Sequence, residues 1–465
     1  MGAHFRIGQS MNNLTLENIA RISGGKFIGD EQKNKMVISA VTTDSRKVEN
    51  DCLFVPIVGE RADGHDYIEK VMAAGALCTL SEHKLADADF PYILVESSLQ
   101  AVKDIAEFYL AGLDIPVIGI TGSVGKTSTK EMIAAVLSQK YKVLKTQGNF
   151  NNELGLPLTI FNIRQEDEIA VLEMGISEFG EMHRLAKVAR PDTCVITNIG
   201  ECHLENLKSR DGVLKAKSEI FDFLKEDGRI VINGDDDKLV TLKDVKGRKP
   251  TFYGIDNQSE AYATNVKGQG LRGISCRIHL AEEEFDVTIP IPGHHMVYNA
   301  LAGAVLGNIY GLEGAEIKKG IESLQPLSGR FNIIETDKYT IIDDCYNANP
   351  ISMKASLEVL QEGIGRKVAI LGDMGELGVD EAMLHKEVGE FAATCQIDMV
   401  ICVGELCQNM GDGIKATNPK MAVIHFADRD ELLEALSQTI KKGDTILVKA
   451  SHFMQFEQVV AALNR

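Results

Sequence analysis

Short apolar runs alternate with stretches of helical spacing along most of the chain. The strands predicted between residues 113 and 327 are 117–120, 169–172, 194–197 and 229–232. Such alternation is typical of a parallel sheet whose strands are connected by helices. The pattern resets near residue 328, and the strands predicted after it are 340–342, 368–371, 399–403 and 445–448. The sequence therefore predicts two α/β units in succession.

The first hundred residues follow a different pattern. Residues 11–112 mix short apolar runs with helical stretches such as 99–110, and the segment that begins at Met11 leads directly into a predicted helix. The whole chain of 465 residues is long enough for about three domains at roughly 150 residues each. We expect these domains at 11–112, 113–327 and 328–465, and leave residues 1–10 outside the fold prediction.

The composition narrows the classes of function. Hydrophobic residues make up 44% and charged residues 25%, as in soluble globular chains, which excludes a disordered protein. The 49 Lys and Arg against 67 Asp and Glu give a net charge of −18, which argues against broad nucleic-acid binding. We expect a cytoplasmic protein that is not an integral membrane protein, because no apolar run reaches about 18 residues and no signal-peptide pattern begins the chain. Nine cysteines without a C-x-x-C pair indicate reduced, mostly buried thiols.

The strongest motif of the chain is Thr121-Gly122-Ser123-Val124-Gly125-Lys126-Thr127-Ser128. It lies between the predicted strand 117–120 and a stretch of helical spacing. In such a loop the backbone amides turn toward a phosphate group, and the helix N-terminus adds its positive dipole. Lys126 supplies a cation for the β- and γ-phosphates, and the Thr127 hydroxyl suits Mg²⁺. The match to G-x-x-x-x-G-K-[ST] fails at the first glycine, where Ile120 stands; the alternative is a glycine-rich turn that only caps a helix.

Two side chains at strand ends are candidates for a metal site near this loop. Glu173 directly follows the predicted strand 169–172, and ligands of open α/β sheets bind at the carboxyl ends of the strands. A glutamate at that place can also simply face solvent. His203 follows the predicted strand 194–197, although a lone histidine is more often structural.

A lysine occupies the apolar face of the next predicted helix. Val213, Lys217, Ile220 and Leu224 are spaced to share one face of a helix over 213–224. Burial of an ammonium group is unfavourable and lowers its pKa. Lys217 is therefore a candidate for chemistry or for a specific ion pair, and the alternative is a side chain that extends to the surface.

Taken together, these motifs resemble those of the Mur ligase family, the ATP-dependent amide-bond enzymes of peptidoglycan precursor synthesis. The resemblance extends from about Leu14 to the end of the chain. Its further motifs are Thr43-Asp-Ser-Arg46, Gly59-Glu-Arg-Ala-Asp-Gly-His65, Thr146-Gln-Gly-Asn-Phe-Asn-Asn152, Glu173-Met-Gly175, Thr197-Asn-Ile-Gly200, Lys217-Ser-Glu-Ile220, Gly293-His-His-Met-Val-Tyr-Asn299, Asp343-Asp-Cys-Tyr-Asn-Ala-Asn-Pro350 and Leu371-Gly-Asp-Met374. The chain departs from the family at Cys202, where a small residue is usual, and at Lys449-Ala-Ser-His452, where the family has Lys-Gly-Ser-Arg.

The resemblance implies an α/β fold with three domains. Residues 11–112 would form a small mixed α/β domain that binds the UDP-muramoyl peptide, and residues 113–327 a central P-loop-type ATPase domain with a parallel sheet. Residues 328–465 would form a C-terminal Rossmann-like domain that closes over the site. A monomer is expected.

The resemblance also assigns site residues. The catalytic residues would be Lys126, His203 and Lys217. The Mg²⁺ ligands would be Thr127, Glu173, His203 and Lys217, the lysine as a carbamate formed with carbon dioxide, which reacts only with a neutral amine. Besides residues 121–128, the ATP-binding residues would be His295, Asn299, Arg330, Asp344, Tyr346 and Asn347. The substrate-binding residues would be Thr43, Asp44, Ser45, Arg46, Asp63, Gly64, His65, Asn149, Asn151 and Asn152.

Within the family, the run Asn347-Ala-Asn-Pro350 favours the step that adds D-alanyl-D-alanine to UDP-N-acetylmuramoyl-tripeptide through an acyl phosphate. ATP and Mg²⁺ are the expected cofactors. One alternative is the preceding amino-acid-adding ligase, which would show Asp-Asn-Pro-Arg there. A second is folylpolyglutamate synthase, which shares the phosphate loop but not the Asp44-Ser-Arg46 domain. A third is a regulatory P-loop switch, which has no use for that domain or for a lysine on the apolar face of a helix.

Overall fold

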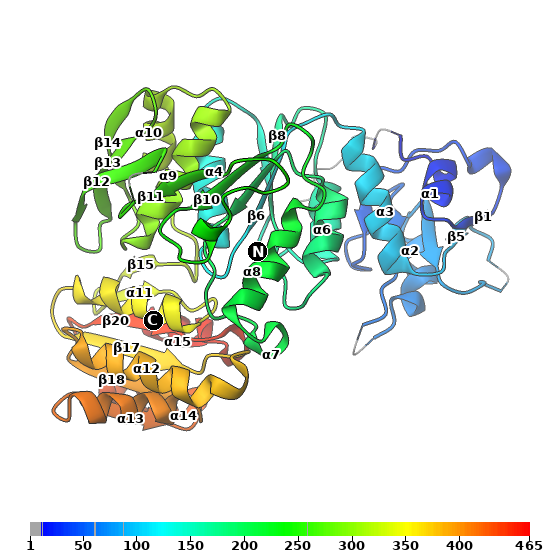
Figure 1. Cartoon of the computed structure of the whole chain (residues 1–465). Helices are drawn as coiled ribbons and strands as arrows, with labels where there is room; N and C mark the ends of the chain where they lie inside the picture. The colour runs from blue at the N-terminus through cyan, green and yellow to red at the C-terminus, as the bar shows by residue number, and fades with distance from the viewer. Residues whose placement is uncertain (1–10, 12, 60–61, 87, 258) are drawn as a thin grey trace.

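Three separate sheets, each flanked by helices, make up the protein (Figure 1). The computed structural model describes residues 11, 13–59, 62–86, 88–257 and 259–465, so Glu60 and Arg61 of the 59–65 motif lie outside the described residues. In Figure 1 the front domain (blue) lies to one side of the central domain (cyan to green), and the C-terminal domain (yellow to red) lies beneath the central one. The predicted three-domain α/β architecture is confirmed.

The front domain is a small mixed sheet with helices. In the part of it that is described, the strands in spatial order are β1 (Lys26–Ile28), β5 (Tyr92–Leu94), β4 (Cys78–Ser81), β3 (Leu53–Phe54) and β2 (Val41–Thr42). Its helices are α1 (Leu16–Ile22), α2 (Ile68–Ala73) and α3 (Ser98–Ala111). Helix α3 confirms the prediction for 99–110, but Met11 does not lead directly into a helix. Helix α1 begins only at Leu16, because the Thr15 hydroxyl accepts a hydrogen bond from Asn18 N (3.1 Å) and caps it there.

The central sheet carries every strand predicted for it. Over the described residues the spatial order is β14 (Glu284–Ile289), β13 (Ile274–His279), β12 (Ala261–Gly268), β11 (Thr251–Gly254), β10 (Arg229–Asn233), β9 (Thr193–Ile196), β6 (Val117–Thr121), β8 (Ile169–Glu173) and β7 (Val143–Lys145). Its helices include α4 (Lys126–Leu137), α5 (Gly155–Ile160), α6 (Glu181–Ala189), α7 (Leu204–Leu207), α8 (Arg210–Ser218), α9 (His295–Ile309) and α10 (Gly314–Glu322). Apolar residues of α4, α9 and α10 cover one face, and those of α6 and α8 belong to the core on the other.

The central sheet is parallel over most of its width, as predicted, and antiparallel at one edge. Strands β7 to β12 pair in parallel, but β13 runs antiparallel to both β12 and β14. In β13 the side chains of Ile274, Cys276 and Ile278 are buried and alternate with partly exposed residues. Such alternation is typical of a strand with one solvated face, which antiparallel pairing permits. The sheet is therefore mixed.

The C-terminal domain is a doubly wound sheet. Its described strands lie in the order β15 (Asn332–Glu335), β16 (Thr340–Asp343), β20 (Thr445–Lys449), β17 (Lys367–Gly372), β18 (Met399–Val403) and β19 (Ala422–Phe426). All neighbours are parallel except β15, which is antiparallel to β16. Its helices α11 (Pro350–Gln361), α12 (Glu381–Thr394) and α13 (Cys407–Thr417) pack on one face, and α14 (Arg429–Thr439) and α15 (Glu457–Leu463) pack on the other.

Two further predictions from composition can be compared with the structure. All nine cysteines are buried and unpaired, as the absence of paired spacings indicates. Within the described ranges of the chain, no helix combines the length and the apolar character that a membrane span requires.

Candidate active site

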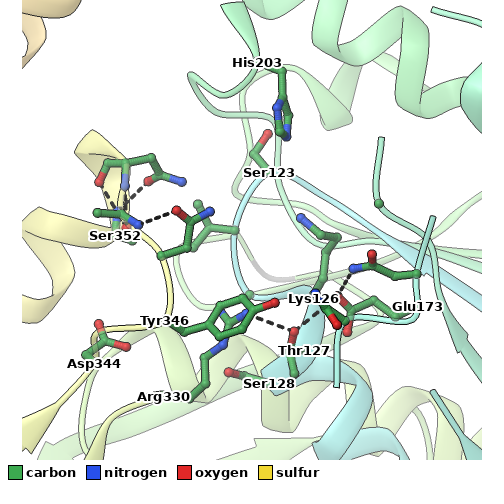
Figure 2. A pocket seen from close by; sticks show the side chains of 18 of the residues that line it. Ser123, Lys126, Thr127, Ser128, Glu173, His203, Arg330, Asp344, Tyr346 and Ser352 are labelled. Carbon is green, nitrogen blue, oxygen red and sulfur yellow. Dashed lines mark hydrogen bonds between the residues drawn. The ribbon is translucent and has the colours of Figure 1, made fainter. Parts of the chain in front are cut away.

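A cavity of about 420 Å³ lies between the central and C-terminal domains. The central domain contributes the loop 123–128, the stretch 149–152, the carboxyl end of β8 and His203. The C-terminal side contributes Arg330, the turn 344–349, Ser352 and Lys449. Figure 2 shows these side chains converging from both domains on one space. The site predicted from scattered motifs is thus assembled from segments that are more than 300 residues apart.

The glycine-rich loop has the geometry that its sequence predicts. It follows β6 and ends where α4 begins at Lys126, and Gly125 has a left-handed φ of 80° at the N-cap position. A Cβ atom on Gly122 would lie 1.9 Å from the Thr197 hydroxyl oxygen, and φ is 152° there, so only glycine fits. The amide of Val124 donates to Asn198 Oδ1 (2.9 Å), and Lys126 Nζ donates to Gly122 O (2.9 Å). The loop is held open at a helix N-terminus, as an anion site requires.

Thr127 and Glu173 place side-chain oxygen atoms close together directly behind the loop. The Thr127 hydroxyl donates to Glu173 Oε1 (3.2 Å), and Asn151 Nδ2 donates to the same oxygen (2.9 Å). The other carboxylate oxygen, Glu173 Oε2, is buried and accepts no hydrogen bond from any described residue. Its nearest cation is the buried Lys130 Nζ at 3.7 Å, which also contacts Glu131. Thr127 and Glu173 therefore form a small, partly compensated anionic site beside the phosphate loop.

Lys217 is completely buried, as its place on the apolar face predicts. Its Nζ atom has no hydrogen-bond partner among the described residues. Burial lowers the pKa of Lys217 to about 8, the neighbouring Cys202 opposes that effect, and the positive charge of Lys126 adds to it. The helix is shorter than the predicted 213–224: α8 ends at Ser218 and a 3-10 turn covers Glu219–Phe221. An amine with a lowered pKa therefore lies close to the phosphate loop.

The residues that the resemblance assigns to ATP fall into two groups. His295 lines the cavity with its ring 4.5 Å from that of Phe331, and burial lowers its pKa to about 4, so the ring is neutral. The Arg330 guanidinium lies 4.2 Å from the centre of the Tyr346 ring and donates to the Thr127 hydroxyl (3.3 Å), as Figure 2 shows. Asn299 does not line the cavity; its Oδ1 accepts a hydrogen bond from Thr129 behind the loop (2.9 Å).

The residues assigned to the UDP-sugar lie elsewhere. The residues of the front-domain stretches 43–46 and 63–65 do not line this cavity. Asp44 and Arg46 form an exposed ion pair (2.8 Å), and the Asp63 carboxylate contacts His65 Nδ1 (2.6 Å). By contrast, Asn149, Asn151 and Asn152 do line the cavity. The structure thus separates the two groups of predicted substrate residues.

Two charged residues that line the cavity, Glu181 and Lys449, were missed at the sequence level. Lys449, at the end of β20, is buried, and its Nζ donates to Asp344 Oδ2 (2.6 Å) and to Asn347 O (3.1 Å). Asp344 also accepts from the Ser356 hydroxyl (2.7 Å) and from Phe331 N (3.3 Å). Lys449 therefore fixes the turn that carries Tyr346 and Asn347. The sequence does contain a signal for Lys449, because this lysine lies at the end of an apolar strand, as Glu173 does.

We expect Asp344→Asn to destabilise the protein by roughly 3–5 kcal/mol, because it leaves the buried Lys449 ammonium without its counter-charge. Asp286→Asn is the matched control: Asp286 pairs with Arg277 at the surface, where water screens the two charges, so its loss should change the stability little. Urea unfolding of the two variants measures the difference. Equal, small effects would show that the Lys449–Asp344 pair does not hold the turn.

Comparisons with known proteins cover nearly the whole chain. Residues 37–110 match a model described as Mur ligase family, catalytic domain; residues 120–307 match the Mur ligase middle domain, and residues 329–452 the Mur ligase, glutamate ligase domain. The UDP-N-acetylmuramoyl-tripeptide–D-alanyl-D-alanine ligase of Bacillus subtilis is 40% identical over 97% of this chain and 98% of its own length.

Solved structures agree with this likeness. A crystal structure of MurF from Acinetobacter baumannii superposes with a TM-score of 0.89 at 29% identity, covering 98% of this chain and 99% of that one. The MurF ligase of Thermotoga maritima, solved in complex with ADP, gives a TM-score of 0.82 at 30% identity and covers 91% and 97% of the two chains.

Proposed function

The chain belongs to the Mur ligase family, and we propose that it is the ATP-dependent ligase that joins D-alanyl-D-alanine to UDP-N-acetylmuramoyl-tripeptide. The reaction forms an amide bond in a precursor of peptidoglycan and so contributes to the cell wall. One observation carries the proposal: the cavity places the phosphate loop, Glu173 and His203 of the central domain opposite the 344–352 turn of the C-terminal domain.

Each domain has a part in this reaction. The front domain (11–112) holds the UDP-sugar through Thr43 to Arg46 and Asp63 to His65, and the peptide runs from there toward Asn149, Asn151 and Asn152. The central domain (113–327) binds the phosphates of ATP with residues 121–128. The C-terminal domain (328–465) holds the nucleotide with Asp344, Tyr346 and Asn347, while Arg330 and His295 lie at the junction between the two domains.

The residues behind the phosphate loop fit Mg²⁺. Mg²⁺ prefers hard oxygen ligands and is bound in such sites through one or two carboxylates together with substrate phosphates. The Thr127 hydroxyl and Glu173 Oε2, which accepts no hydrogen bond from the described residues, are ligands of this kind, and we assign His203 to the same cation or to one of its waters. Bound Mg²⁺ neutralises charge on the phosphoryl group that is transferred.

Lys217 fits the role of a carbamate. Carbon dioxide reacts with a neutral amine, and the lowered pKa of this buried lysine makes the neutral form accessible near neutral pH. The product carries a negative charge and two oxygens at the end of the side chain, where an unpartnered nitrogen now lies. We therefore propose that carbamylated Lys217 is an anionic ligand near the phosphate loop.

The reaction proceeds in two steps. A carboxylate is a poor electrophile, so its oxygen first attacks the γ-phosphorus of ATP, and ADP leaves with an acyl phosphate formed. Lys126 stabilises the negative charge on the transferring group by position and charge, as in other phosphoryl transfers. The amino group of D-alanyl-D-alanine then attacks the acyl carbon, and the tetrahedral intermediate expels inorganic phosphate. No protein nucleophile is required.

Closure of the C-terminal domain protects the acyl phosphate. Water would hydrolyse this intermediate, and a closed cavity excludes water until the amine is in place. Arg330 joins the two domains in the closed arrangement, because its guanidinium contacts Tyr346 on one side and Thr127 on the other.

A substrate-omission assay tests the proposed function. ADP release is measured with ATP and Mg²⁺ alone, and then after addition of UDP-N-acetylmuramoyl-tripeptide, of D-alanyl-D-alanine, and of both. We expect rapid release only with both substrates, because neither phosphoryl transfer nor amide formation is productive without them. ADP release at the full rate with ATP alone would indicate a nucleotide hydrolase or switch.

A further inference from the structure

The central and C-terminal domains meet at a second place besides the junction at Arg330. Helix α7 follows His203 directly, and its Leu204 packs against the core of the central domain and against that of the C-terminal domain. The C-terminal side of this contact is the loop 373–380. A Cβ atom on Gly378 would lie 3.3 Å from Glu205 N, so the loop backbone approaches α7 closely.

One side chain of the loop reaches the candidate metal ligand. Glu376 Oε2 lies 2.6 Å from His203 Nδ1. Both residues have the left-handed backbone conformation that is uncommon for side-chain-bearing residues, with φ of 62° and 52°. The two residues that meet, one from each domain, therefore both have an uncommon backbone conformation.

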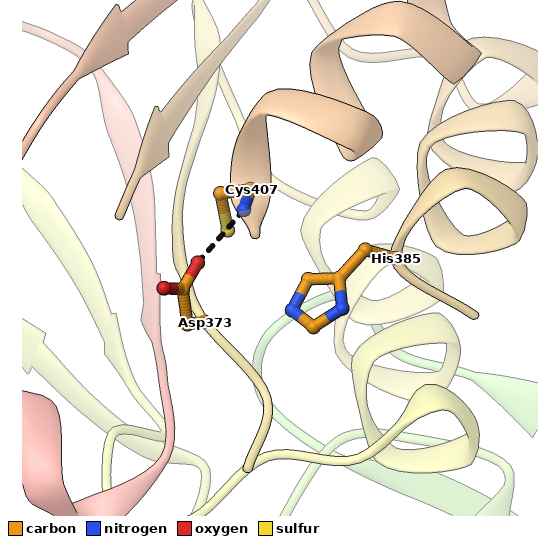
Figure 3. Close-up of side chains that lie close together, drawn as sticks. All are labelled: Asp373, His385 and Cys407. Atoms are coloured by element: carbon orange, nitrogen blue, oxygen red, sulfur yellow. Dashed lines mark hydrogen bonds between the residues drawn. The ribbon is translucent and has the colours of Figure 1, made fainter. Parts of the chain in front are cut away.

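The loop is held firmly in its own domain. Figure 3 shows the side chains of Asp373, the first residue of the loop, His385 and Cys407 lying close together. Asp373 Oδ1 accepts from Cys407 N (2.7 Å), and His385 Nε2 accepts from Met374 N (2.9 Å) while its Nδ1 contacts Glu381 O (2.7 Å). Gly375 N donates to the Ser451 hydroxyl (2.9 Å).

The close grouping of Asp373, His385 and Cys407 has the residue types of a metal site. Both ring nitrogens of His385 already have partners, and burial raises the pKa of the Cys407 thiol well above its usual value. The cluster therefore serves to anchor the loop, and Glu376 extends from a fixed base.

We infer that Glu376 is a positioning residue that the C-terminal domain supplies to His203. A proton on Nδ1 is the arrangement that fits the 2.6 Å separation from the carboxylate, because two acceptors would repel each other at this distance. The lone pair then lies on Nε2, on the side of the ring away from Glu376, where a cation or its water can use it. Carboxylates that hold ligating histidines in this way fix the tautomer and the ring orientation.

The inference rests on the proposed function and adds one feature to it. Because His203 belongs to the central domain and Glu376 to the C-terminal domain, the histidine acquires its defined tautomer only when the two domains meet. Closure of the C-terminal domain then also sets the tautomer of His203, so the two changes occur together. Glu376 lies outside the Mur ligase motifs and the phosphate loop, so those motifs do not reveal this coupling.

The imidazole tautomer of His203 tests the inference without reference to activity. Full-length protein with ¹⁵N-labelled histidine is studied by two-bond ¹H–¹⁵N NMR in the presence of ADP, and His203→Asn identifies the His203 signals. We expect the Nδ1–H tautomer in the unmodified protein and in Glu376→Gln, whose amide oxygen still accepts the proton, and a mixture of tautomers in Glu376→Ala.

Mn²⁺ binding in the presence of ADP, followed by electron paramagnetic resonance, gives the second readout. We expect Glu376→Ala to weaken it by roughly 10–100-fold, the usual effect of losing a residue that orients a ligand. The matched control is Glu205→Gln, an exposed acid two residues from His203, which should change neither readout. An unchanged tautomer and Mn²⁺ affinity in Glu376→Ala, or equal changes in Glu205→Gln, would overturn the inference. If the unmodified protein failed to join D-alanyl-D-alanine to UDP-N-acetylmuramoyl-tripeptide, the proposed function would be contradicted, whereas the tautomer result would still hold.

Discussion

Replacing Lys126 with alanine is expected to lower the ligation rate by at least about 10²–10³-fold, the range seen when one group that stabilises transition-state charge is removed. Lys126 is the first residue of α4 and the mobile cation of the phosphate loop, where its Nζ now contacts only Gly122 O among the hydrogen bonds described. Neither Thr127 nor the loop amides carry a full positive charge, and the Arg330 guanidinium is already held between the Tyr346 ring and the Thr127 hydroxyl. Initial rates of ADP release with both substrates measure the effect.

The fold of the Lys126→Ala variant should be unchanged, because the lysine side chain is not part of the core. Lys187→Ala is the control, since Lys187 is an exposed lysine on α6 of the same domain. Its rate should remain that of the unmodified protein. If the Lys126→Ala protein folded well and kept near-normal turnover, the assignment of residues 121–128 as a phosphate site would be wrong.

The second large effect is expected at Lys217. Lys217→Ala should be nearly inactive, because the carbamate and its charge are lost, whereas the stability of the protein should not fall. The buried Nζ has no hydrogen-bond partner in the described part of the chain, so its removal leaves no other group unpaired. Lys215→Ala on the exposed face of the same helix is the matched control and should retain full activity.

Two measurements separate a carbamate from a structural lysine. Small carboxylates added to Lys217→Ala should restore part of the activity by filling the vacated anionic position. In the unmodified protein, ¹³C-labelled carbon dioxide should give a carbamate signal that increases as pH rises through about 8, because only the neutral amine reacts and the pKa of Lys217 is lowered to about 8. Full activity of Lys217→Ala without added carboxylates would show that the lysine is merely structural.

Much of the fold could be predicted from local patterns. Apolar runs bounded by polar residues located β6, β8, β9 and β10 of the central sheet and β16, β17, β18 and β20 of the C-terminal sheet, and the glycine-rich loop between β6 and α4 marked the candidate phosphate site. Helical spacing placed Lys217 on the apolar face of its helix, and the structure decides between the two readings that this left open, because the side chain is buried. These features depend on neighbours in sequence, which is why the sequence carries them.

What escaped prediction depends on contacts between distant segments. The antiparallel edge formed by β13 was not foreseen, because short apolar runs look alike in parallel and antiparallel sheets. The early end of α8 at Ser218 also could not be read from the spacing, since a 3-10 turn continues the same apolar face through Ile220. Nothing in the sequence marks Glu376 as a site residue. Its role depends on its contact with His203, which is 173 residues away in the chain and belongs to another domain.

The choice of amine tests the central claim most directly. Two acceptors, UDP-N-acetylmuramoyl-tripeptide and the corresponding dipeptide, are each offered with ATP and with D-alanyl-D-alanine, lysine or diaminopimelate in parallel, and product formation is followed by mass. The mechanism predicts that the tripeptide acceptor with D-alanyl-D-alanine gives the fastest reaction and that the single amino acids react poorly with either acceptor. Faster addition of lysine or diaminopimelate to the dipeptide acceptor would contradict it and assign the protein to the preceding step.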